Sequence, residues 1–249
     1  MAGARPAIGG QGAGRIPALD LARGAALVAM AVYHLTYDLE MFGHLPPGTA
    51  VTGGWAVFAR LVAGSFLFLA GVSLFLAHRE GIRWASFMRR LAVIGVAAAA
   101  VSLGTWAAMP DRFVYFGILH SIAAASIVGL AFLRMPAMVT LAAAVAVVAL
   151  ARLPGTAVFD SAIFWPLGLS RTNPPAIDYV PLVPWLAPFL AGIAAARIAD
   201  RHGLFQWLAA RPACAPAWTL WPGRHSLVVY LVHQPVLIGL VWAATQLVR

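Results

Sequence analysis

Residues 19–39 read LDLARGAALVAMAVYHLTYDL, and this stretch decides the fold. It is long and apolar enough to cross a bilayer as an α-helix, which needs about 20 residues. Four ionisable side chains nevertheless lie within it: Asp20, Arg23, His34 and Asp38. At about 100° per residue, they fall within a sector of about 60° on the helix surface. We expect this polar stripe to face protein, because ionisable groups facing lipid are expensive.

The composition predicts an all-α integral membrane protein. Of the 249 residues, 62% are hydrophobic and 10% are charged, which is more apolar surface than one soluble core can hide. We predict seven transmembrane helices in a single domain, residues 15–249, after a disordered Gly- and Ala-rich leader, residues 1–14. The predicted spans are Leu19–Leu39, Trp55–Ala77, Arg90–Met109, Phe113–Leu133, Pro136–Leu153, Tyr179–Ile198 and Ser226–Val248.

The arginines predict the orientation in the membrane. All 17 Lys and Arg residues are arginine, and positive residues prefer cytoplasmic loops. Most of them flank one side of the predicted spans: Arg5, Arg15, Arg79, Arg83, Arg89, Arg90, Arg134, Arg197, Arg201, Arg211 and Arg224. The other side has only Arg112, Arg152, Arg171 and Arg249. The N-terminus is therefore predicted to be cytoplasmic. The net charge of +9 reflects contact with anionic membrane lipid, not nucleic acid.

Common catalytic motifs are missing from the sequence. It contains no Gly-rich phosphate loop, no Ser nucleophile elbow and no His-Glu-x-x-His pattern. The histidines lack the close spacing of zinc ligands, so we predict no metal site. The single Cys214 excludes an internal disulfide and fits a small packing residue. Any chemistry must come from polar residues within or beside the spans.

Those polar residues predict two layers. Counted from the predicted helix ends, one layer lies near the external face and contains His34, Asp38, Arg60, His120, Asp178 and Tyr179. The other lies in the cytoplasmic half and contains Asp20, Arg23, Arg224, His225, Ser226, Tyr230, His233 and Gln234. A carboxylate one turn from His34 can hold its ring and raise its basicity, so His34 is the predicted general base.

Each of these residues also has a structural interpretation. Asp20 and Arg23 can form a local ion pair at a helix start. Arg60 can serve as a counter-ion for Asp38 or Asp178. A buried histidine such as His120 or His233 is usually a hydrogen-bonded core residue.

Five motifs in order resemble the bacterial branch of the heparan-alpha-glucosaminide N-acetyltransferase catalytic-domain family. They are Arg15-Ile16-Pro17-Ala18-Leu19-Asp20-Leu21-Ala22-Arg23-Gly24; Tyr33-His34 with Tyr37-Asp38-Leu39; Phe116-Gly117-Ile118-Leu119-His120; Asp178-Tyr179 with Pro181-Leu182 and Pro184-Trp185; and Gly223-Arg224-His225-Ser226-Leu227 with Tyr230-Leu231-Val232-His233-Gln234-Pro235. The resemblance covers nearly the whole chain after the leader.

The resemblance implies a transmembrane acyltransferase. Acyl-CoA, with acetyl-CoA as the favoured donor, is presented from the cytoplasm, and its acyl group passes to a sugar or other envelope acceptor across the membrane. The lysosomal member of the family has its catalytic histidine in the loop after the first helix. Here the nearest match is His44, offset by one residue. Because the chain is much shorter than that enzyme, heparan sulfate is not carried over as the substrate.

We therefore expect an acyltransferase of the bacterial cytoplasmic membrane. His34, with Asp38 orienting it, is the expected base, and His44 is the alternative. The expected acceptor pocket contains Arg60, His120, Asp178, Tyr179 and Trp185, and the expected donor site contains Arg23, Arg224, Ser226, Tyr230, His233 and Gln234. Two other interpretations remain open: a proton-coupled transporter or flippase that uses the same His and Asp residues, and an accessory subunit whose polar residues join helices.

Overall fold

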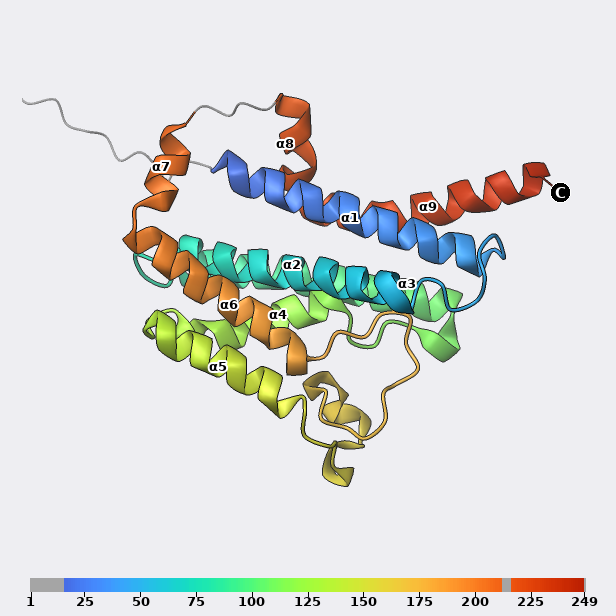
Figure 1. The fold of residues 1–249 in the computed structure, drawn as a ribbon, viewed down its shortest axis with the longest axis horizontal. Helices are drawn as coiled ribbons and strands as arrows, with labels where there is room; N and C mark the ends of the chain where they lie inside the picture. Colours follow the sequence, from blue (N-terminus) through green and yellow to red (C-terminus); the bar gives the residue numbers. More distant parts are fainter. Residues whose placement is uncertain (1–15, 212–215, 249) are drawn as a thin grey trace, which may run out of the picture.

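The computed structural model describes residues 16–211 and 216–248, which form an all-helical bundle (Figure 1). The predicted leader and Cys214 lie outside the described residues. Within the described part there is no β-strand. The α-helices are α1 (Pro17–Met41), α2 (Gly53–His78), α3 (Trp84–Ala108), α4 (Ile118–Phe132), α5 (Ala137–Leu150), α6 (Leu182–Arg201), α7 (Leu204–Ala210), α8 (Ala217–Arg224) and α9 (Ser226–Val248). Short 3-10 helices are η1 (Pro110–Arg112), η2 (Ala157–Phe159) and η3 (Ala162–Leu167).

The long helices confirm the predicted fold class. Five of the described helices, α1, α2, α3, α6 and α9, are long and apolar enough to cross a membrane. The helices at the fourth and fifth predicted spans are shorter, with 15 residues in α4 and 14 in α5. The count of seven crossings therefore stays a prediction. The chain is an integral membrane protein.

Glycines let the central helices α2 and α6 approach closely. A Cβ atom added at Gly71 would lie 2.1 Å from the carbonyl oxygen of Phe189, and one added at Gly192 would lie 2.1 Å from that of Phe68. The two backbones therefore meet at two points where only glycine fits. Small residues at such contacts are how membrane helices pack, because lipid offers no hydrophobic drive between them.

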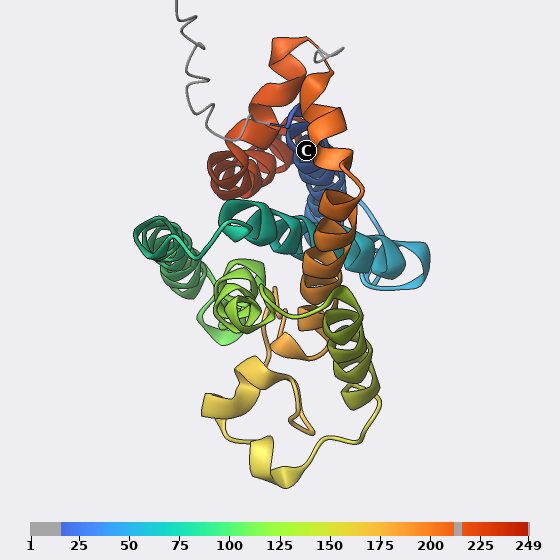
Figure 2. The same cartoon turned by 90° about the vertical axis from the view of Figure 1, so that its left-hand side faces the viewer.

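Helices α1 and α9 run parallel along one flank of the bundle, and α5 lies at the opposite flank (Figures 1 and 2). The start of α1 packs on α8 rather than on α9, because Gly223 leaves room for the carbonyl oxygen of Asp20. The contact between α1 and α9 therefore begins only beyond this point, well after the first residue of α1, so the two helices are offset along their length. This offset decides which polar residues meet.

One end of the bundle gathers arginines from several helices. Arg79, just after α2, pairs with Asp200 of α6 at 2.9 Å. Arg197 of α6 donates to the carbonyl oxygen of Leu133, which follows α4. Helix ends that are far apart in sequence thus share one basic end. This agrees with the one-sided arginine distribution, while the assignment of that end to the cytoplasm stays a prediction.

The segment between α5 and α6 packs at the other end. Asp160 accepts hydrogen bonds from the backbone and guanidinium of Arg171, which holds the pKa of Asp160 below its usual value. Further along, the amide of Val180 donates to the carbonyl oxygen of Phe116 at 2.9 Å. The segment therefore closes over the start of α4.

Candidate functional site

His34 of α1 and His233 of α9 form a close pair. Nδ1 of His34 lies 2.6 Å from Nε2 of His233, the ring planes are 14° apart and the ring centroids are 4.8 Å apart. Two ring nitrogens cannot lie 2.6 Å apart if the rings stack face to face at van der Waals separation. The rings therefore meet edge to edge, as in a hydrogen bond between two imidazoles.

The second nitrogen of His233 is also engaged. Its Nδ1 lies 2.5 Å from the carbonyl oxygen of Tyr230, one turn earlier in α9. Tyr230 is half-buried at the centre of the bundle, where it packs against all three hydrophobic clusters of the described residues. His233 is thus fixed by its own helix and by α1.

Asp38 pairs with Gln234 rather than with His34. Nε2 of Gln234 donates to Oδ1 of Asp38 at 2.7 Å, and Asp38 is completely buried. Within the described chain, no hydrogen bond joins Asp38 to His34, so the expected orienting contact does not form. The other oxygen of each side chain, Oδ2 of Asp38 and Oε1 of Gln234, is buried without a described hydrogen-bond partner.

These contacts correct the prediction of two separate layers. The sequence predicts His34 and Asp38 in the external layer and His233 and Gln234 in the cytoplasmic one, but the structure joins all four in one site. Counting depth from helix ends failed because α1 starts beside α8, so the two helices are offset.

His44, the alternative base, lies elsewhere. Its Nε2 is 2.7 Å from the hydroxyl of Thr245 near the end of α9. The loop that carries His44 is held by Glu40, which accepts hydrogen bonds from the amides of Gly48 and Ala50. At 1.5 Å per residue, Thr245 lies about 18 Å along α9 from His233. His34 and His44 therefore belong to different levels of the bundle.

A groove of about 540 Å³ leads from the basic end into the bundle. Arginines from α1 and α3 line it together with serines and apolar side chains, and its lining includes Arg23, Ser73, Ser86, Arg89, Arg90, Ile118, Ser226 and Tyr230. Among the described residues, Arg90 has no hydrogen bond or ion pair. A half-buried guanidinium without an anion beside it is typical of a site for an anionic ligand.

Arg23 is fixed at the rim of this groove. Its guanidinium donates to Asp20 at 3.0 Å and to the hydroxyl of Ser73 at 2.8 Å. Arg224 approaches the same Asp20 carboxylate, at 3.5 Å, from α8. The expected ion pair of Asp20 and Arg23 is therefore present, and it extends to a second arginine.

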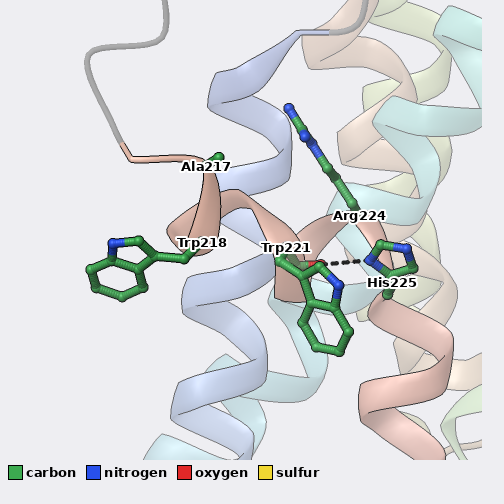
Figure 3. A pocket seen from close by; sticks show the side chains of 5 residues that line it. All are labelled: Ala217, Trp218, Trp221, Arg224 and His225. Carbon is green, nitrogen blue, oxygen red and sulfur yellow. Dashed lines mark hydrogen bonds between the residues drawn. The ribbon is translucent and has the colours of Figure 1, made fainter.

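Arg224 lines a different pocket, of about 490 Å³, on the outer side of α8 (Figure 3). In Figure 3 its side chain points away from the ring of Trp221, and His225 contacts the carbonyl oxygen of Trp221. Trp218 and Trp221 are 76% and 52% exposed there. Exposed tryptophans beside arginine are typical of a membrane interface. Of the expected donor residues, Arg23, Ser226 and Tyr230 line the groove, whereas Arg224 does not.

Asp178 and Tyr179 lie at the start of α4. Oδ2 of Asp178 accepts a hydrogen bond from the amide of Ile118 at 3.2 Å, and Gly117 leaves room for the carboxylate. Burial raises the pKa of Asp178 to about 6, although the amide opposes this shift. Tyr179 donates its hydroxyl to the carbonyl oxygen of Trp165. Asp178 is therefore bound to the backbone of Ile118, which lines the groove, although Asp178 itself is not among the lining residues.

The other expected acceptor residues are separated. His120 contacts the hydroxyl of Ser102 through Nε2 and the amide of Gly117 through Nδ1, both at 3.3 Å. Trp185 packs against the main hydrophobic cluster. Arg60 is exposed and forms no ion pair with Asp38 or Asp178 in the described structure. These three residues are not brought together by any described contact.

Sequence reasoning missed Arg89 and Arg90 as site residues. The sequence marks them only as an orientation signal, because the third predicted span begins at Arg90. In the structure α3 begins at Trp84 and places both arginines on the groove wall. The buried Phe87 shows that the helix already packs before Arg90. The available signal in the sequence is the aromatic pair Trp84 and Phe87, three residues apart, whose rings meet edge to face.

No group of three or more His, Cys, Asp or Glu in the described residues is placed to hold a metal ion. Searches of curated proteins and of solved structures found no match. The family model described as "Heparan-alpha-glucosaminide N-acetyltransferase, catalytic" matches residues 15–235, which include the His34–His233 pair and the groove. The chain therefore belongs to the heparan-alpha-glucosaminide N-acetyltransferase catalytic family.

Proposed function

We propose that this membrane protein transfers an acetyl group from acetyl-CoA to a hydroxyl or amine of a sugar or other envelope acceptor. The groove carries this proposal, because it runs from three arginines to Tyr230, whose carbonyl oxygen holds His233 beside His34. Family membership supports transferase activity. We place the protein in a bacterial cytoplasmic membrane with its basic end inside, where acetyl-CoA is available.

The groove suits the shape and charge of the donor. The phosphates of CoA would meet Arg23, Arg89 and Arg90, since guanidinium groups bind phosphate in bidentate geometry. The long, weakly polar arm would follow the apolar walls inward. Its thioester would then lie near Tyr230 and Ile118.

His34 would act as general base at the thioester. Its free ring nitrogen takes the proton from the acceptor hydroxyl or amine as that group attacks the thioester carbonyl. The bond from carbon to sulfur breaks, and the leaving thiolate takes the proton from His34. The products are the acetylated acceptor and CoA, and His34 returns to its starting state.

The position of the groove favours His34 over His44 as base. Tyr230 lines the groove and lies three residues before His233, whereas His44 contacts the far end of α9. Asp178, whose carboxylate accepts a hydrogen bond from the amide of the groove residue Ile118, would contact the acceptor. His120, Tyr179, Trp185 and Arg60 stay proposed acceptor residues from the sequence. Gln234 would bind Asp38 and Arg224 would pair with Asp20. Neither residue would then contact the donor.

Calorimetry on detergent-purified protein tests the donor site. Acetyl-CoA should bind the wild type, and Arg90→Gln should weaken binding by about 1.5–3 kcal/mol, which is about 10- to 150-fold. Arg83→Gln is the matched control, because Arg83 is an exposed arginine at the same end whose Nε donates to the carbonyl oxygen of Ala77. Absence of binding by the wild type, or equal affinity in the Arg90 variant, would contradict the proposal and favour a transporter.

A further inference from the structure

We propose that His233 is a positioning residue that fixes the tautomer of His34 and leaves Nε2 of His34 as the basic atom. This inference rests on the proposed function for its catalytic consequence, although the tautomer itself follows from geometry. It assigns His233 a role different from the donor contact expected from the sequence.

The carbonyl oxygen of Tyr230 determines which nitrogen of His233 carries the proton. A carbonyl oxygen can only accept a hydrogen bond, so Nδ1 of His233, 2.5 Å away, must carry the proton. In a neutral imidazole only one nitrogen carries hydrogen. Nε2 of His233 therefore has a lone pair and accepts.

The contact between α9 and α1 in turn determines which nitrogen of His34 carries the proton. Since Nε2 of His233 accepts, the hydrogen in the 2.6 Å contact belongs to Nδ1 of His34. Neutral His34 then has its lone pair at Nε2. The near-coplanar rings, 14° apart, give this N–H···N hydrogen bond good in-plane geometry.

This chain of three groups can support base catalysis. When Nε2 of His34 takes a proton, the ring becomes a cation, and its Nδ1–H donates a charge-assisted hydrogen bond to His233. A histidine thus does what a carboxylate does in a Ser-His-Asp triad, which is to hold the base in one tautomer and stabilise its charged form. Asp38 is occupied by Gln234 and does not serve here.

A neutral partner also suits the surroundings. Asp38 is already a fully buried carboxylate one turn from His34, and a second carboxylate in the place of His233 would add another costly buried negative charge. A neutral His233 supplies the hydrogen-bond acceptor without this second buried charge. The half-buried position of both rings agrees with this arrangement.

Nitrogen-15 NMR on protein labelled at histidine tests the proposal without an activity assay. Signals are assigned with His34→Gln and His233→Gln. The wild type should show a protonated Nδ1 and an unprotonated Nε2 in His34. His233→Ala should release His34 into a mixture of tautomers. Thr245→Val, which removes the contact to His44 on the same helix, should leave the His34 signals unchanged.

Activity gives a second readout. His233→Ala should lower turnover by about 10²-fold, the lower end of general-base effects. His233→Gln should recover part of this loss, because its amide oxygen can accept from Nδ1 of His34. A wild-type His34 protonated at Nε2, or His34 signals unaffected by His233→Ala, would overturn the proposal. The tautomer without any acetyl transfer would instead contradict only the proposed function.

Discussion

Gln234 of α9 donates a 2.7 Å hydrogen bond to the fully buried carboxylate of Asp38 in α1. Together with the His34–His233 contact one turn away, it fastens α9 to the first helix. Most of α9 is otherwise lightly covered by protein, with Val232, Val236 and Leu240 exposed. These two polar contacts therefore carry much of the specificity with which α9 docks.

The contribution of the hydrogen bond between Gln234 and Asp38 to stability can be tested by paired substitutions. Asp38→Ala leaves the amide of Gln234 without its acceptor and should cost about 1–3 kcal/mol. Asp38→Asn keeps an oxygen for that amide and should cost less. Thermal unfolding in detergent compares the two. Equal midpoints for the two variants would show that the hydrogen bond does not hold the helices.

Helix packing gives a second prediction. Gly192→Ala places a methyl group against the backbone of Phe68 and should destabilise the protein by about 1–3 kcal/mol. Gly64→Ala in the same helix pair is the control, because nothing lies within 4 Å of its added Cβ. Alanine there should stabilise the helix by up to about 1 kcal/mol. If both variants unfolded at the same temperature, the conclusion that α2 and α6 pack closely at Gly192 would be contradicted.

Asp178 predicts a pH-dependent stability. Its pKa is raised to about 6, so the folded protein binds more protons than the unfolded chain between about pH 4 and pH 6. Stability should therefore be greatest below that range and fall as the pH rises through 6. Asp178→Asn removes the titrating group. The stability of the variant relative to the wild type should therefore be higher at pH 7.5 than at pH 4. If the melting temperatures of Asp178→Asn and the wild type differed by the same amount at pH 4 and at pH 7.5, the prediction would be contradicted.

Membrane orientation is tested by cysteine labelling in a Cys214→Ser background. Pro47→Cys lies in the loop after α1, and Glu80→Cys lies in the loop after α2 at the arginine-rich end. An impermeant reagent applied from outside should label position 47 and miss position 80. The reverse pattern would put the groove mouth outside the cell and remove it from cytosolic acetyl-CoA.

Hydropathy predicts much of the fold because apolar runs of about 20 residues have few alternatives in a membrane. It placed the starts of α1 and α9 within two residues of their observed positions. It did not predict α7 and α8, since they are short and lie between spans. The contacts of Gly71 and Gly192 were also hidden, because spacing within one helix does not reveal which helices pack together.

The candidate site was only partly predictable for the same reason. Helical periodicity placed His34 and Asp38 on one face, and Tyr230 and His233 on another. Pairing them required the offset between α1 and α9, which the contact of Gly223 with Asp20 sets. Asp38 was therefore assigned to the wrong partner, although its position on a polar face was predicted.

The most direct test of the account is acetyl transfer in cells that lack the gene and carry wild-type, His34→Ala or His44→Ala protein at equal membrane levels. Mass spectrometry of envelope glycans and lipids measures the acetylated product. Wild type should restore an acetyl mass, His34→Ala should reduce its rate of appearance at least about 100-fold, and His44→Ala should reduce it less. Near-normal acetylation by His34→Ala with an inactive His44→Ala would move the base to the loop and contradict the account.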